Sequence, residues 1–155
     1  MISEPLAIWE VKPEQLHETW PFILRGLETI KRRIKPDWIP DDIYAFLASE
    51  NSRCLMAQRG PRPLGFIIYT KDTFPHSRRT ELFIRAAWNL PIREQVEADR
   101  MPETVLAMWR CLGQIAKTAL GTNRIGWWTT ANRARAFEKK YGWRPMHTSF
   151  HVEVD

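Results

Sequence analysis

TELFIRAAW, at residues 80–88, begins the part of the chain that decides the fold. It is an apolar run of strand length, and a polar, irregular stretch follows it. Residues 102–121 then place apolar side chains at helical spacing, with Pro102 suited to the start of a helix and Gly121 to its end. RIGWWTT, at residues 124–130, is a second strand-like run. A strand, a long helix and another strand in this order predict a right-handed crossover between parallel strands.

A β-hairpin is predicted just before this unit. The runs at 53–58 and 64–70 are apolar and flank RGPRP, at residues 59–63. A short turn rich in Gly and Pro between two such runs is typical of a hairpin. The polar segment at 71–79 is expected to connect the hairpin to the strand at 80–88, so all three strands should share one sheet.

The N-terminal part predicts one strand and two helices. The apolar run at 6–12 is a strand that Pro13 ends. Apolar residues then recur at helical spacing as far as residue 30, and Pro21 is expected to kink or divide this helix. A second, short helix is predicted at 40–48, with acidic residues in its first turn, where they suit the helix dipole.

The C-terminal part predicts a short basic helix at 132–140, with Gly142 as its left-handed cap, and a closing strand at 147–154, where apolar and polar residues alternate. The complete order is therefore β-α-α-β-β-β-α-β-α-β, which is an α/β sandwich. No repeat or linker divides the chain, so residues 1–155 are expected to form a single domain.

The composition fits one globular domain and argues against several other classes. The 155 residues are 44% hydrophobic and 26% charged, so the chain can bury a core without disulfides or a structural metal. Cys54 and Cys111 lie in apolar contexts and are predicted to be free thiols. No apolar run approaches the roughly 20 residues that span a bilayer, and no signal-peptide pattern is present, so we expect no membrane partner and a cytoplasmic location.

Charge and aromatic content indicate what kind of partner to expect. The net charge is +5, but acidic residues interrupt the basic ones, which argues against a nucleic-acid partner. Eight tryptophans predict a substantial contact surface for a protein partner or a second copy of the chain. The four histidines lack metal-ligand spacing, and no Ser-His-Asp order is present. We therefore expect neither a metal site nor a hydrolase.

The stretch TANRARAFEKKYGWRP, at residues 130–145, resembles the GNAT superfamily of acyl-CoA-dependent N-acetyltransferases, and the order of elements extends the resemblance over essentially the whole chain. The matched positions are Asn132, Ala134, Phe137, Gly142 and Trp143, with the Asn one residue closer to the glycine than usual. The resemblance implies a GNAT-like three-layer α/β/α sandwich whose mixed sheet is splayed at its centre.

The same resemblance implies an acetyl-CoA site, although its sequence signature is missing. Members of the family carry a glycine-rich loop before the long helix, whereas residues 89–101 here contain no glycine. The backbone near Ala86 to Trp88 is expected to hold the pantetheine arm, and N–H groups at the helix start are expected to bind the pyrophosphate. The cofactor-binding residues implied are Ala86, Ala87, Trp88, Arg100, Glu103, Thr104 and Asn132.

Two functions remain open at this point. The first is an N-acyltransferase that moves an acetyl group from acetyl-CoA to an amine, with Glu81 as the implied catalytic base. The second is a catalytically silent protein, similar to GNAT-like proteins of tailed bacteriophages, that acts in virion structure or assembly through protein contacts. The missing glycines and the tryptophan content favour the second function, as does Glu138, which occupies the place of the family's tyrosine acid.

Overall fold

A mixed sheet of five strands runs through the centre of the protein. The computed structural model describes residues 4–74, 79–90 and 103–127, together with the single positions 135, 138, 139 and 142. The strands lie in the order β1-β2-β3-β4-β5, the first four antiparallel and the last pair parallel. Their bounds are β1 Leu6–Glu10, β2 Arg53–Arg59, β3 Arg62–Phe74, β4 Arg79–Asn89 and β5 Ile125–Trp127.

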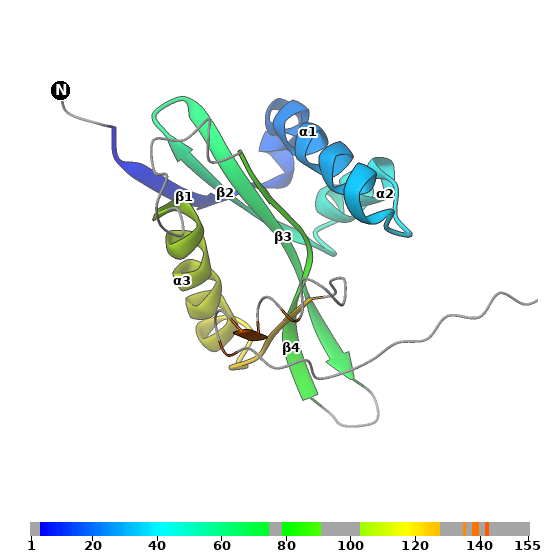
Figure 1. The fold of residues 1–155 in the computed structure, drawn as a ribbon, viewed down its shortest axis with the longest axis vertical. Helices are drawn as coiled ribbons and strands as arrows, with labels where there is room; N and C mark the ends of the chain where they lie inside the picture. Colours follow the sequence, from blue (N-terminus) through cyan, green and yellow to red (C-terminus); the bar gives the residue numbers. More distant parts are fainter. Residues whose placement is uncertain are drawn as a thin grey trace, which may run out of the picture.

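Helices cover both faces of this sheet, which confirms the predicted three-layer arrangement (Figure 1). A 3₁₀ turn, η1 (Pro13–Gln15), leads into α1 (Leu16–Ile34), and α2 (Pro40–Ala48) packs beside α1 on one face. On the other face lies α3 (Glu103–Thr118), which contacts β1 to β4. Pro21 lies inside α1 without dividing it, so the predicted division there is wrong. Pro21 is exposed, and the carbonyl that its missing N–H leaves unbonded can be hydrated by water.

Two apolar clusters hold the layers together, one on each face of the sheet. Alternate residues of each strand enter opposite clusters, because side chains point to opposite faces with a period of two. Under α1 and α2 lie the buried side chains of Ile23, Leu27, Ile43, Met56, Phe66 and Ile68. Under α3 lie those of Leu55, Ile67, Leu82, Ile84, Met108 and Leu112. The six described tryptophans are all half-buried against these clusters.

The hairpin and the strand after it are longer than predicted. β3 continues through the segment that we predicted to be a polar connection, up to Phe74, and Lys71 to Phe74 pair with the first residues of β4. This end of the β3–β4 ribbon projects beyond the helices (Figure 1). Because it has no core to cover, its sequence carries no apolar alternation, and the strand signal is lost there.

Some predicted elements lie outside the described residues. These are the closing strand at 147–154, most of the helix at 132–140 and most of the stretch at 89–100. Gly142 is described and has a φ of 69°, and its N–H donates a hydrogen bond to the carbonyl of Glu138 over 3.0 Å. This geometry confirms the predicted left-handed cap.

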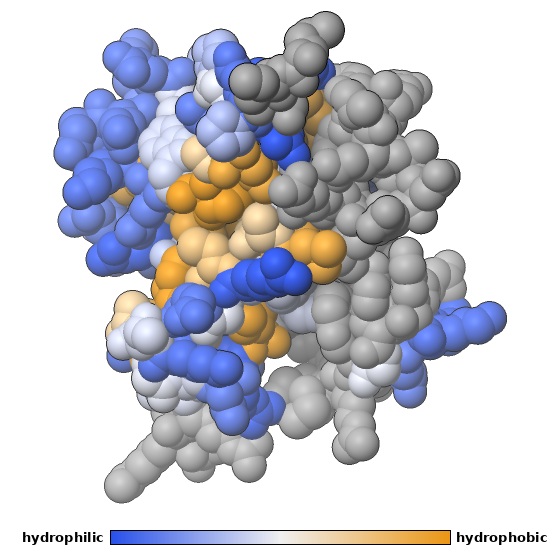
Figure 2. Space-filling model, turned by 90° about the vertical axis from the view of Figure 1, so that its left-hand side faces the viewer, coloured by the Kyte–Doolittle hydropathy of each residue, from blue (hydrophilic) through white to orange (hydrophobic). Residues whose placement is uncertain are grey.

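The surface over α3 and β1 has an apolar band. Figure 2 shows apolar side chains gathered at the centre of this face, with hydrophilic ones around them. Leu6 and Ile8 of β1 and Cys111 and Ile115 of α3 are half-buried there, and Leu106 is 42% exposed. In the part of the chain that the structure describes, every helix is too short or too polar to cross a membrane.

Candidate functional site

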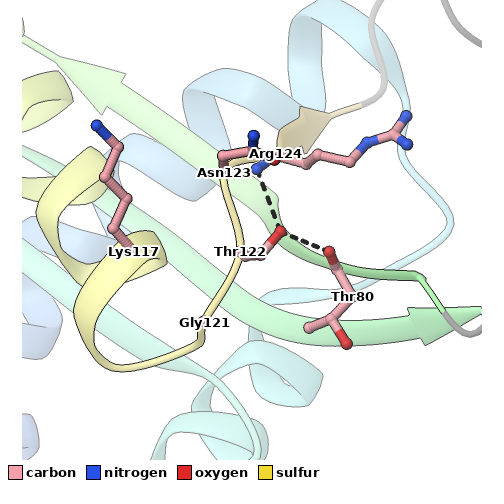
Figure 3. A pocket seen from close by; sticks show the side chains of 6 residues that line it. All are labelled: Thr80, Lys117, Gly121, Thr122, Asn123 and Arg124. Carbon is pink, nitrogen blue, oxygen red and sulfur yellow. Dashed lines mark hydrogen bonds between the residues drawn. The ribbon is translucent and has the colours of Figure 1, made fainter.

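A cavity lies where α3 ends and β4 and β5 begin. It has a volume of about 670 Å³, and its lining is Thr80, Lys117, Gly121, Thr122, Asn123 and Arg124 (Figure 3). The Thr122 hydroxyl donates to the Thr80 carbonyl over 2.6 Å and accepts from the Arg124 N–H over 3.2 Å. These bonds attach the turn to the start of β4. Ligands of sheets with parallel strands bind towards the opposite, carboxyl ends, so we look for the binding site of an anionic or extended ligand there.

At the carboxyl end of β4, an irregularity breaks the strand ladder. Ile68 of β3 pairs with Ala86 and Tyr69 pairs with Ile84, so Arg85 is an extra residue, a β-bulge. The last described pair between β4 and β5 is Ile84 with Trp127. The bulge therefore lies one residue beyond the described parallel pairing, at the position where β4 continues towards Asn89.

The bulge changes which face the side chains of β4 occupy. Leu82 and Ile84 lie in the cluster under α3, whereas Ala86 lies in the cluster under α1, and Trp88 packs against that same cluster. Strict alternation would place all four on one face. The extra residue thus inverts the second half of the strand and turns Ala87 and Asn89 towards the α3 side.

On the α3 side of the second half, Asn89 is the polar residue of interest. Its Oδ1 is buried and has no hydrogen-bond partner within the described residues. It lies over Gly65, where a side-chain Cβ would collide with it. Ala87, on the same side, is small and exposed, so this part of the strand is open. Asn89 was not among the residues predicted from the sequence, where its only signal is a polar residue at the end of an apolar strand.

The opposite side of β4 carries Glu81 and Arg85. The half-buried Glu81 lies beside Gly126 of β5, and a Cβ built there would be 2.9 Å from its Oε1. Arg85 is exposed, with its guanidinium carbon 5.5 Å from the centroid of the Phe46 ring of α2. The Glu81 carboxylate and the Arg85 guanidinium therefore lie on one face of β4, on either side of Phe83.

Comparison with known proteins gives one kind of match. No family model matches the sequence, and no curated protein does either. Among solved structures, the ribosomal-protein-alanine N-acetyltransferase of Brucella melitensis biovar Abortus has a TM-score of 0.67 at 12% identity, over 97% of this chain and 100% of that one. A "predicted acetyltransferase with acetyl-CoA" from Clostridium acetobutylicum has a TM-score of 0.67 at 14% identity, over 96% of both chains. An aminoglycoside acetyltransferase from an uncultured soil metagenomic sample has a TM-score of 0.66 at 15% identity, over 97% of this chain and 99% of that one.

The chain has the GNAT fold. The likeness runs over nearly the whole length, which confirms the fold that the sequence predicted. At these identities it shows the fold alone. A similarity to phage proteins is not shown, and that interpretation stays a prediction.

Three predicted cofactor-binding residues are neighbours at the end of β4, and their side chains lie on two different faces of the sheet. Ala86 is buried under α1, Trp88 is half-buried on the same side, and Ala87 is exposed on the other. Glu103 and Thr104 form the first turn of α3, and the Thr104 side chain is buried. The end of α3 adjoins the start of β4, so this first turn lies towards the carboxyl end of β4.

Two predicted cofactor-binding residues, Arg100 and Asn132, lie outside the described residues. Their roles therefore stay predictions, and so do the roles given to Glu81 and to the residues of β4 and α3.

The two cysteines of this chain are not activated as nucleophiles. Both are free, and burial raises the pKa of the Cys54 and Cys111 thiols, so they remain protonated at neutral pH. Burial likewise raises the pKa of the Tyr69 hydroxyl under α3. Within the described ranges, no group of three His, Cys, Asp or Glu residues is arranged to hold a metal ion.

Proposed function

We propose that the protein is an N-acyltransferase that transfers an acetyl group from acetyl-CoA to an amine. The observation that carries this proposal is the bulge at Arg85, directly beyond the described pairing of β4 with β5. The acetyltransferases with the same fold support it, one of them described with acetyl-CoA.

A bulge suits acyl transfer because it frees backbone groups. An extra residue in one strand cannot pair with its neighbour, and its N–H and C=O remain available to a ligand. A backbone N–H that is already fixed in direction can bind the oxygen of an acyl group as negative charge develops on it. The backbone at Arg85, the residue without a partner in β3, would do this here.

The residues near the bulge fit a coenzyme A pantetheine arm. Such an arm carries amide N–H groups, and the buried Oδ1 of Asn89 is an acceptor without a partner in the described part of the chain. The exposed Ala87 beside it leaves room on the α3 side. The first turn of α3 points N–H groups towards this end of the sheet, where they can bind an anion such as a pyrophosphate.

Glu81 would take the proton from the attacking amine, directly or through water. It has no hydrogen bond or ion pair with any described residue, so its carboxylate is available as a base. Acetyl-CoA supplies the activated thioester from which the acetyl group is transferred. A cytoplasmic location is part of the proposal.

The fold alone does not select the acceptor. Two of the similar structures are a ribosomal-protein-alanine N-acetyltransferase and an aminoglycoside acetyltransferase, so closely similar folds serve chemically different amines. The acceptor must therefore be sought in the side chains that line this chain's own site.

Calorimetric titration with acetyl-CoA, and separately with free coenzyme A, tests the proposal. We expect saturable binding near one ligand per chain, and weaker binding in Asn89→Ala if its Oδ1 accepts a hydrogen bond from the ligand. Absence of heat and of thermal stabilisation at millimolar ligand would reject the proposal. The catalytically silent protein would then be favoured, and the apolar band over α3 and β1 would be the first surface to test for a partner (Figure 2).

A further inference from the structure

We infer that the acceptor is a small amine that also carries a carboxylate, and that Arg85 binds this carboxylate. The inference rests on the proposed function and names its substrate class. It comes from the side of β4 that is open to an acceptor, and from the charges placed on that side.

An acceptor cannot reach Glu81 from the α3 side. On that side, the first half of β4 is covered: Leu82 is completely buried and Ile84 is 7% exposed, both packed in the cluster under α3. Glu81 lies on the other face, as its position beside Gly126 requires, because Ile125 and Trp127 pack in the α3 cluster. An amine that approaches Glu81 therefore lies along the opposite face, on which Glu81 is half-buried and Arg85 is exposed.

On this face the amine meets Arg85. The guanidinium lies over the ring of Phe46, and this cation–π contact fixes the charge without using its N–H donors. Arg85 has no ion pair with a carboxylate of the described residues. Its five donors match the geometry of a carboxylate, which a guanidinium can bind through two parallel hydrogen bonds.

The spacing between Glu81 and Arg85 suits a short molecule. Arg85 comes four positions after Glu81, so their Cα atoms are roughly 10–13 Å apart, since a strand rises about 3.3 Å per residue. Both side chains are long and shorten the gap between the carboxylate and the guanidinium. An amine and a carboxylate joined by a few carbons can therefore reach both groups.

Matched pairs of acceptors test the inference. Acetylation of β-alanine, γ-aminobutyrate and ε-aminocaproate is compared with acetylation of their primary amides, using the full chain and acetyl-CoA. For at least one of these carbon-chain lengths, we expect kcat/KM of the carboxylate to exceed that of its amide by about tenfold. This ratio is roughly what one hydrogen bond to a charged group contributes. We expect the preference to weaken at high salt.

Arg85→Gln should abolish this preference, mainly through KM, and Arg85→Lys should retain part of it. Arg110→Gln is the matched control, because Arg110 is an exposed arginine of α3 on the opposite face. Thermal denaturation confirms that each variant is folded. Equal rates for every pair, or a preference that persists in Arg85→Gln, would overturn the inference and leave the proposed function intact. Absence of acetyl-CoA binding in the wild type would overturn both.

Discussion

The two halves of β4 follow the same alternation in the sequence but face opposite ways in the protein. Before the bulge, Leu82 and Ile84 face α3, and β5 pairs alongside. After it, Ala86 and Trp88 face α1. One additional residue, Arg85, separates the two arrangements. One inserted residue can thus turn the two halves of a strand towards opposite layers of the fold.

The two halves also divide the proposed chemistry. The first half holds Glu81, the proposed base, against a fixed parallel neighbour. The second half holds the bulge and the buried Oδ1 of Asn89, which we assign to the acyl group and the coenzyme. Changes in the first half should therefore affect proton transfer, and changes in the second should affect the acyl donor.

The largest expected effect is that of Glu81→Gln in the first half. Loss of a general base lowers kcat by about 10²–10⁴-fold, because the amine must then lose its proton without help. Binding of acetyl-CoA should be unchanged, since it depends on the second half. Steady-state kinetics and calorimetry on the same preparation measure both quantities.

Asp72→Asn is the control for this change. Asp72 pairs with Glu81 across β3 and β4, but it lies one strand farther from β5. We expect near-normal kcat in this variant. If Asp72→Asn lost activity and Glu81→Gln did not, the base would be Asp72.

Deletion of Arg85 is the next largest change and tests the boundary between the halves. Without Arg85, Ile84 and Ala86 become neighbours, and β4 can pair regularly with β3 while every remaining side chain keeps its face. We expect a folded protein whose kcat falls about 10²–10³-fold, the usual cost of losing an oxyanion donor. Circular dichroism and kinetics measure the two outcomes.

Arg85→Gln separates the bulge from the side chain, because it keeps the extra residue. It should retain turnover of neutral amines that the deletion loses. Equal activity of the deletion and the wild type would show that the bulge plays no part in the reaction.

Most of the fold could be predicted from the sequence because it depends on apolar periodicity. The crossover at 80–130, the hairpin and the N-terminal helices all carry strong local patterns. The bulge could not be predicted, since Leu82, Ile84, Ala86 and Trp88 alternate as if on one face. Asn89 and Arg85 were missed for the same reason: their roles depend on which face the bulge gives them.

Two glycines, in helices on opposite faces of the sheet, test how closely α1 packs on the second half of β4. In α1, a Cβ on Gly26 would collide with the rings of Phe66 and Trp88, so Gly26 lets the helix approach the second half of β4. In α3, Gly113 has open space around its Cβ position. The same substitution by alanine should therefore have opposite effects on stability.

We expect Gly26→Ala to destabilise the protein, since overpacking costs about 1–3 kcal/mol and the gain in helix propensity returns only about 1 kcal/mol. Gly113→Ala increases the helix propensity without a steric clash, so it should raise the free energy of unfolding by up to about 1 kcal/mol. Urea denaturation measures both. A Gly26→Ala protein as stable as the Gly113→Ala protein would contradict the close packing of α1 on β4.

Gly126→Ala is expected to have the smallest effect, and it acts on the first half without changing any charged group. The added methyl would lie 2.9–3.1 Å from the carboxylate atoms of Glu81, and this flexible side chain can move away. Stability should hold or rise, because alanine loses less backbone entropy than glycine in a strand. The displaced carboxylate should lower kcat by less than about tenfold, which corresponds to under about 1.4 kcal/mol. A decrease that also occurred in the Glu81→Gln background would mean that Gly126 acts on the reaction through something other than Glu81.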